Sequence, residues 1–173
     1  MNVPVLIRQY QGGDAETSYS AVRESIDELS CWMPWCHPGY SLQDAKNWAS
    51  AAAARFVDRS AFEFVVSNSS GDYLGGCGLN QIRPLDRVAN LGYWVRSSQT
   101  AKGIATSAVR EVAAWAFAQT NLVRLEIVVA EGNARSRRVA EKVGAHCEGI
   151  LRKRIFLHGR SEDALMFALV RRE

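Results

Sequence analysis

The sequence lacks several features that mark whole classes of proteins. None of its four cysteines belongs to a CxxC pair and no secretory signal precedes them, a pattern typical of a reduced, cytoplasmic protein rather than a disulfide scaffold. No uncharged stretch reaches the roughly 20 apolar residues of a membrane span. The longest, 29–43, contains two prolines and a glycine. We therefore expect a cytoplasmic protein that does not enter the membrane.

Nucleotide and metal motifs are also missing. The pattern GxxxxGK[ST] does not occur and no GxGxxG follows a predicted strand, so nucleoside triphosphates and dinucleotides lose support as ligands. Cys31, Cys36 and His37 lie close together, but one half-site without a second pair of ligands does not make a zinc site. We expect no metal.

The chain has only a small excess of basic over acidic residues, and that excess is concentrated in one stretch. The net charge is only +3, too small to indicate direct binding of nucleic acid. The stretch from Asn133 to Arg154 nevertheless holds seven basic residues against two acidic ones. Such a stretch suits a small polyanion or an acidic protein surface, the alternative being a solvated helix face.

The composition is that of an ordinary globular protein. Of 173 residues, 47% are hydrophobic and 23% are charged, which suffices to bury a sizeable core. The length favours a single domain over residues 1–173.

Hydrophobic periodicity divides the chain into strands and helices. In order, we expect a strand at 3–10, helices at 14–29 and 41–58, strands at 62–66, 73–82 and 88–96, a helix at 103–119, a strand at 123–129, a helix at 133–144 and two strands that turn at 158–160. Helix 103–119 would join two parallel strands by a crossover. This order predicts an α/β fold in which helices cover a mixed sheet. Trp48 and Trp115 lie on helical stripes and are predicted to be core.

Two segments indicate chemistry. GYWVRSSQTAKGIA, residues 92–105, leads from a strand through a loop into a helix, so backbone N–H groups and the positive end of a helix dipole meet at one point, as in an anion site for a pyrophosphate. NARSRRVAEKVG, residues 133–144, is a short helix that places Ser136 on its apolar face. That hydroxyl either bonds a nearby carbonyl or lies over a reaction centre.

Together these segments resemble the GNAT superfamily of acetyl-CoA-dependent N-acetyltransferases, and within it the RimJ/RimL-like group. LGYWV with KGIAT is similar to the end of the family's fourth strand and its pyrophosphate loop, and NARSRRVAEKVGAHCEG is similar to its N-x-x-S-x-x-V-A-E-K-x-G segment. The WMPWC segment also resembles this group. The resemblance implies a mixed, mostly antiparallel sheet of about seven strands, whose fourth and fifth strands splay apart around the cofactor.

The resemblance also implies site residues. Backbone groups of Trp94, Val95 and Arg96 would pair with the pantetheine arm, and a backbone N–H near Trp94 or Val95 would stabilise the oxyanion. Asn133 would face the cofactor and Ser136 would protonate the departing thiolate. The pyrophosphate would lie on Ala101, Lys102, Gly103, Ile104, Ala105 and Thr106.

The chain departs from the family pattern at three positions. Thr100 stands where the loop has Gln or Arg, and Ala101 replaces a frequent glycine. Asn90 lies where relatives often carry Glu, and an amide cannot take up a proton at neutral pH. A water chain could deprotonate the amine instead, as could Glu63, Asp27 or Glu28, although each of these carboxylates also fits a solvated surface.

For the acceptor pocket, Trp32 and Trp35 are expected to form walls, and Glu28 is our choice for substrate contact. We expect transfer of an acetyl group from acetyl-CoA to a primary amine, either a protein N-terminus or a small molecule, by a monomer or homodimer. The alternative is a non-catalytic acyl-CoA-binding or sensory module, which Asn90 favours and Asn133 with Ser136 opposes.

Overall fold

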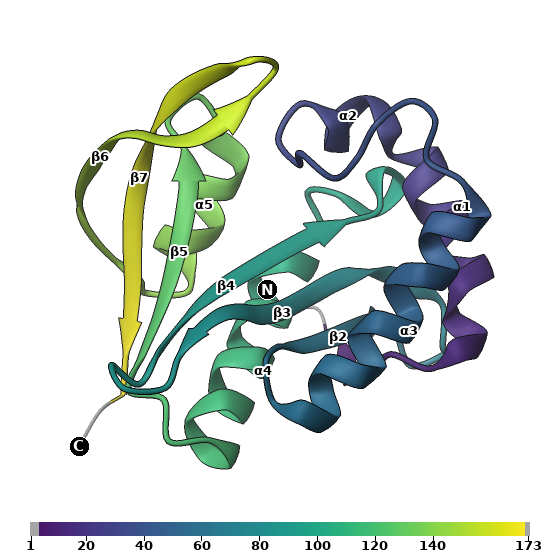
Figure 1. Ribbon diagram of the computed structural model, residues 1–173, viewed down its shortest axis with the longest axis horizontal. Helices are drawn as coiled ribbons and strands as arrows, with labels where there is room; N and C mark the ends of the chain where they lie inside the picture. Colours follow the sequence, from purple (N-terminus) through teal and green to yellow (C-terminus); the bar gives the residue numbers. More distant parts are fainter. Residues whose placement is uncertain (1–3, 172–173) are drawn as a thin grey trace.

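A seven-stranded sheet in the order β1-β2-β3-β4-β5-β7-β6 runs through the computed structural model, which describes residues 4–171 (Figure 1). The strands are β1 (Leu6–Gln9), β2 (Phe62–Ser67), β3 (Tyr73–Arg83), β4 (Val88–Val95), β5 (Arg124–Ala130), β6 (His146–Leu157) and β7 (Arg160–Val170). Neighbouring strands are antiparallel except β4 and β5, which are parallel. The mixed, mostly antiparallel sheet predicted from the sequence is confirmed; residue 3, the predicted start of the first strand, lies outside the described residues.

Helices cover both faces of the sheet. They are α1 (Ala15–Glu24), α2 (Ile26–Ser30), α3 (Leu42–Asp58), α4 (Ile104–Gln119) and α5 (Ala134–Lys142), with short 3₁₀ turns η1 (Gly12–Asp14) and η2 (Ser97–Gln99). Helix α4 makes the crossover from β4 to β5. The helices α1 and α3 lie together beside β2, β3 and β4, at some distance from β5, β6 and β7 (Figure 1).

The predicted helix 14–29 is two helices, because the chain breaks at Ser25. The Ser25 hydroxyl donates to the Ala21 carbonyl at 2.7 Å and accepts the Ser97 backbone N–H at 2.9 Å. A contact with a residue far along the chain therefore decides this break. Asp14 also differs from expectation, since its carboxylate binds Arg8 at 2.6 Å instead of capping α1. The expected capping box of Ser41 and Asp44 at the start of α3 is present.

Two apolar clusters lie on opposite faces of the sheet. The larger fills the space under α4 and α5, and includes Leu79, Leu91, Val109, Leu125 and Phe167. Trp115 packs against it beside three phenylalanines, as predicted. The smaller cluster lies under α1 and α3.

Trp48 is not core. Its side chain is 39% exposed, and alanines form the buried stripe of α3. The small alanines let α3 approach the sheet, so the bulky indole is left at the edge of the helix contact.

Candidate active site

The site is a cleft that opens where β4 and β5 separate. The two strands pair only from Val88 to Asn90 and from Arg124 to Glu126. Beyond these residues they diverge, as Figure 1 shows, and the space is part of a cleft of about 780 Å³. One end is lined by β5 residues Ile127–Ala130 and the other by aromatic residues of the α2–α3 segment.

The free edge of β4 presents backbone groups to this cleft. The Arg96 N–H donates to the Leu74 carbonyl of β3 at 2.8 Å. Because backbone groups alternate in direction along a strand, those of Trp94 and Gly92 also point to β3, while those of Tyr93 and Val95 point into the cleft. Of the two N–H groups that the sequence offered as oxyanion donors, Val95 therefore faces the cleft and Trp94 does not; Trp94 lines the cleft with its side chain.

The loop after β4 leads to the N-terminus of α4. Gly103 precedes the helix with a φ of 84° and no side chain caps the first turn, so the N–H groups of that turn are open to a ligand. Ala101 has a φ of 62°, a left-handed conformation that favours glycine. The Lys102 ammonium is held by the Ser98 carbonyl at 3.0 Å and the Gln99 side chain at 2.9 Å. This geometry suits an anion at the N-terminus of α4.

Ser136 lies on the β5 side and forms a pair of hydroxyls with Tyr93. The two oxygens are 2.9 Å apart, and the Tyr93 hydroxyl also donates to the Ser136 backbone carbonyl at 3.0 Å. Asn133 caps α5, its side-chain oxygen accepting the Ser136 backbone N–H at 3.0 Å. Burial raises the pKa of Tyr93 to about 12, so its phenol stays protonated. Sequence reasoning did not single out Tyr93. The strand pattern predicts which face of the sheet its side chain lies on, but not that α5 contacts that side chain.

Aromatic side chains form the other wall. Trp32 and Trp35 line the cleft together with Trp48 and Trp94, and the rings of Trp35 and Trp94 lie 6.2 Å apart. Trp32 reaches across to the β5–α5 turn, because a Cβ placed on Gly132 would lie 3.6 Å from its ring. The α2–α3 segment therefore spans the cleft from one half of the sheet to the other.

Glu63 is the unexpected member of the site. The sequence favoured a solvated surface position, whereas its side chain is buried, with 9% exposed, and lines the cleft. Burial raises the pKa of Glu63 to about 7, against the lowering effects of Arg55 and of a hydrogen-bonding contact with Asn80. A carboxyl that titrates near neutrality in a cleft is a functional candidate.

Asn90 belongs to a chain of side chains beside Glu63. Its amide donates to the Asn80 oxygen at 2.9 Å, and both line the cleft. The amide at this position therefore orients Asn80, which contacts Glu63 in turn.

Glu28 is placed away from the acceptor wall. Its carboxylate accepts from Ser97 at 2.8 Å and from Arg135 at 2.9 Å. These contacts lower the pKa of Glu28 and tie α2 to η2 and α5. The structure thus puts Glu28 beside the anion loop, while Glu63 lies in the cleft itself.

Metal ligation finds no support in residues 4–171, where no three His, Cys, Asp or Glu side chains are grouped so that they could hold an ion. In the same range no helix is long and apolar enough to cross a membrane.

Comparison with known proteins identifies the family. Residues 5–146 match the family described as acetyltransferase (GNAT) domain. The chain belongs to the GNAT acetyltransferases. Over its whole length this GNAT protein is 36% identical to YdaF of Bacillus subtilis (strain 168), whose name provisionally calls it a ribosomal N-acetyltransferase, and it covers 94% of that protein.

Solved structures of the family have the same fold. RimJ of Mycobacterium smegmatis, in complex with a CoA disulfide, superposes with a TM-score of 0.88 at 27% identity, covering 98% of this chain and 84% of RimJ. RimL, a ribosomal L7/L12 α-N-protein acetyltransferase solved with CoA, superposes with a TM-score of 0.90 at 18% identity, covering 96% and 93% of the two chains. The expected RimJ/RimL-like fold is thereby confirmed.

The GNAT assignment also decides between the two functions left open by the sequence. The chain is an N-acetyltransferase that uses acetyl-CoA, and the non-catalytic alternative suggested by Asn90 loses its support. The structure fits this donor, since a free β4 edge leads along the chain to an uncapped helix N-terminus.

Proposed function

We propose that this protein transfers an acetyl group from acetyl-CoA to the α-amino group of a protein N-terminus, by direct attack within a ternary complex. The observation that carries the proposal is the full-length similarity to a protein named for ribosomal N-acetylation. Beside it stands a cleft with an aromatic wall along β4, the strand that leads to the uncapped N-terminus of α4. A ribosomal acceptor would place the protein in the cytoplasm. A monomer or homodimer stays our prediction for the assembly.

The donor would lie along β4. Its pyrophosphate would bind the backbone amides of 101–106, and its pantetheine arm would pair with cleft-facing groups of Val95 beside Trp94 and Arg96. Because the loop follows Val95, the thioester at the far end of the arm would lie nearer the strand pairing, beside Tyr93. The Tyr93 N–H faces the cleft and would then be the oxyanion donor.

Ser136 would act as the acid. Its hydroxyl and that of Tyr93 are within 2.9 Å of each other, so a proton given to the CoA thiolate by Ser136 can be replaced from the phenol. Asn133 positions Ser136 by capping α5. The remaining contribution is alignment of amine and thioester, which can supply several kcal/mol of the barrier.

The acceptor would enter between Trp32 and Trp35. A small-molecule acceptor is the second candidate, because an L-amino acid N-acetyltransferase of Escherichia coli, AaaT, is 29% identical over 68% of this chain. An α-amine is common to both candidates. They differ in whether peptide residues beyond the first contribute to binding.

A thiol-release assay tests the proposal. Purified protein with acetyl-CoA is offered N-terminal peptides of ribosomal proteins, free amino acids and polyamines. We expect acceptor-dependent CoA release with peptides, and a kcat/KM that rises with peptide length. Release with amino acids but not with peptides would overturn the N-terminal assignment in favour of the second candidate.

A further inference from the structure

The carboxylate of Glu63 lies over β3 because the residue beneath it is a glycine. Glu63 of β2 pairs with Gly78 of β3. A Cβ on Gly78 would fall 2.1 Å from Oε2 of Glu63 and 2.8 Å from its Cδ, which is far closer than atoms can approach. The Glu63 side chain therefore reaches across Gly78 towards β4 and not outward to solvent.

A second glycine keeps the next strand open. Gly78 pairs with Gly92 of β4, and a Cβ on Gly92 would meet nothing closer than the Asn80 amide at 4.0 Å. Adjacent strands are about 4.8 Å apart, so the carboxylate over Gly78 lies roughly one strand spacing from Gly92. Space for an amine, or for one bridging water, therefore separates Glu63 from the β4 edge beside Tyr93.

The charged and titratable groups around Glu63 do not neutralise it. Across residues 4–171 Glu63 forms no ion pair. Arg55 of α3 lowers the pKa of Glu63 without contacting it, and its guanidinium stacks over the Trp48 ring at 4.9 Å. Tyr10, which follows β1, and Cys77 of β3 are buried and have pKa values raised well above neutrality, so both stay uncharged. Asn80 offers a neutral contact. Glu63 thus faces the cleft without an ion-pair partner among residues 4–171.

We propose that Glu63 is the general base of this acetyltransferase and takes the proton of the acceptor ammonium. The inference rests on the proposed amine acetylation and adds a catalytic residue on β2. On β4, Asn90 has an amide that cannot take up a proton. Asn80 and Asn90 then act as positioning residues that hold the carboxylate over Gly78.

The proposed step balances in protons and bonds. The ammonium gives one proton to the Glu63 carboxylate, and the free amine attacks the thioester carbonyl carbon to form the new C–N bond. The C–S bond breaks, and the thiolate takes a proton from Ser136, which Tyr93 replaces. The acceptor nitrogen loses its second proton, which returns to the hydroxyl pair of Ser136 and Tyr93. Glu63 releases the proton that it took from the ammonium to solvent.

The test uses Glu63→Gln, which retains the shape of the side chain but cannot accept a proton, with Glu111→Gln on the exposed face of α4 as the matched control. The wild type and the control should show a kcat/KM that rises with pH through an apparent pKa near 7. Glu63→Gln should lose about 100-fold at pH 7 and recover with pH as the amine itself deprotonates. Acetyl-CoA affinity should match that of the wild type, and so should thermal unfolding at pH 4.5.

Two results would overturn the inference. One is a Glu63→Gln variant that keeps wild-type kcat/KM and its pH profile. The other, which needs no turnover, is an NMR titration of 13C-labelled glutamate in which the Glu63 resonance shifts with a midpoint below pH 5. The pH profile is measured with whichever amine the wild type acetylates. The acceptor panel then tests the proposed N-terminal substrate, and the Glu63→Gln variant separately tests the proposed base.

Discussion

At the scale of single residues, the Ser136 and Tyr93 hydroxyls decide how the leaving group departs. Ser136→Ala should lower kcat about tenfold or more while the Kd for acetyl-CoA changes less than twofold, since the acid acts only as the C–S bond breaks. Steady-state kinetics and calorimetric titration measure the two quantities, with Ser50→Ala on the exposed face of α3 as the control. Equal losses in turnover and affinity would show that the hydroxyl binds the donor instead.

Glu63 also links pH to stability. Its pKa is raised from 4.5 to about 7 in the folded protein, so the folded state binds more protons than the unfolded state between these pH values. The free energy of unfolding should therefore fall as pH rises from about 4.5 to 7, through this group alone, by roughly 2–3 kcal/mol in total.

Replacing Glu63 by Gln should remove this penalty. We expect the variant to be more stable than the wild type at pH 8 and close to it at pH 4.5, measured by urea unfolding at both values. A difference that does not vary with pH would show that Glu63 is ionised well below neutrality in the folded state. Such a stability cost is typical of residues retained for function.

At the scale of elements, the two glycines on β3 and β4 have different tasks. Gly78→Ala should destabilise the fold by about 1–3 kcal/mol, because the new methyl meets both the Glu63 carboxylate and, at 2.8 Å, the Phe62 carbonyl.

Gly92→Ala should leave the melting temperature unchanged, since the methyl has space, yet lower kcat/KM by narrowing the gap between Glu63 and β4. Thermal melts and kinetics separate the two effects. A fully active Gly92→Ala would place the reaction elsewhere in the cleft.

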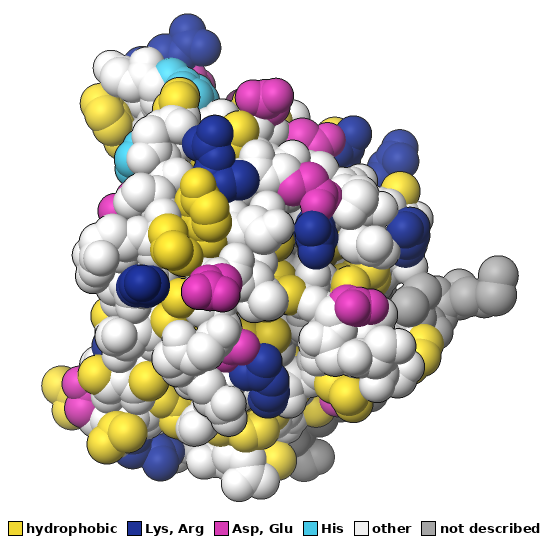
Figure 2. Space-filling model, turned by 90° about the vertical axis from the view of Figure 1, so that its right-hand side faces the viewer, with side chains coloured by type: hydrophobic (Ala, Val, Ile, Leu, Met, Phe, Trp, Pro, Cys, Tyr) yellow, Lys and Arg dark blue, Asp and Glu magenta, His cyan; other side chains and the backbone are white. Residues whose placement is uncertain are grey.

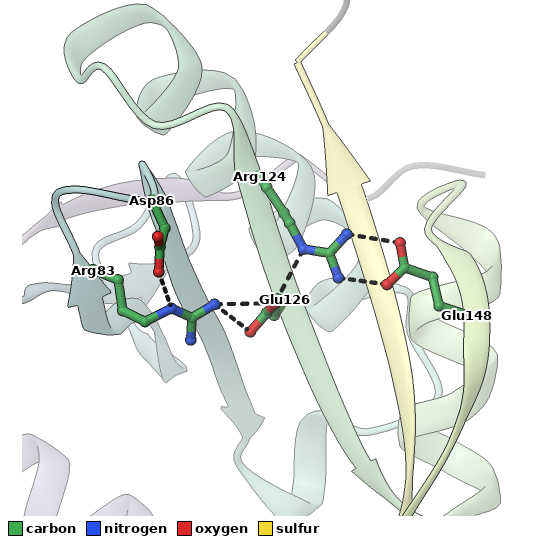
Figure 3. A network of polar contacts seen from close by, with 5 residues as sticks. All are labelled: Arg83, Asp86, Arg124, Glu126 and Glu148. Carbon is green, nitrogen blue, oxygen red and sulfur yellow. Dashed lines mark hydrogen bonds and ion pairs between the residues drawn. The ribbon is translucent and has the colours of Figure 1, made fainter.

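The closed end of the cleft is held by an ion-pair network, shown in Figure 3. Arg83 near the end of β3 contacts Glu126 of β5 at 3.3 Å, and Arg124 of β5 joins Glu126 to Glu148 of β6. Glu126 is the last β5 residue paired with β4, so the network clamps the strands where the splay begins. The Arg124 and Glu126 side chains are largely buried, with 24% and 13% exposed, so the network joins β3, β5 and β6 at this end of the cleft.

At the scale of the whole molecule, charge is unevenly distributed. On the face that carries α1 and α3, acidic and basic side chains are interspersed, as Figure 2 shows. In the basic stretch 133–154, Arg135 and Arg137 pair with Glu28 and Glu141, while Arg138, Arg152 and Arg154 form no ion pair within residues 4–171. These unpaired cations can attract the phosphates of the donor.

Acetyl-CoA affinity should therefore depend on salt. We expect the Kd to rise several-fold between 0.05 and 0.5 M NaCl, because the added ions screen the attraction between the basic stretch and the phosphates. Calorimetric titration measures it, with S-acetylpantetheine, which carries no phosphate, as the control ligand. An acetyl-CoA affinity indifferent to salt would mean that the stretch is only a solvated surface.

The sequence by itself determined the parts of this protein that depend on neighbours along the chain. Hydrophobic periodicity fixed the number and order of the strands, the Ser41 and Asp44 box fixed the start of α3, and the stripe on α5 correctly placed Ser136 on the inner face. The anion loop before α4 was equally visible, since a strand, a glycine and a helix follow one another within 92–105.

Only the tertiary structure decided which carboxylate lies in the cleft. The periodicity of the sequence assigns both Glu63 and Glu28 to the surface. Gly78 on the next strand leaves space that the Glu63 carboxylate fills. Hydrogen bonds from Ser97 and Arg135 hold Glu28 beside the loop before α4. Trp48 changed from core to cleft wall for the same kind of reason, because the alanines of α3 take the contact with the sheet. The burial and the pKa of a side chain depend on the groups around it, many of which come from segments far apart in the sequence. Local periodicity does not predict those contacts.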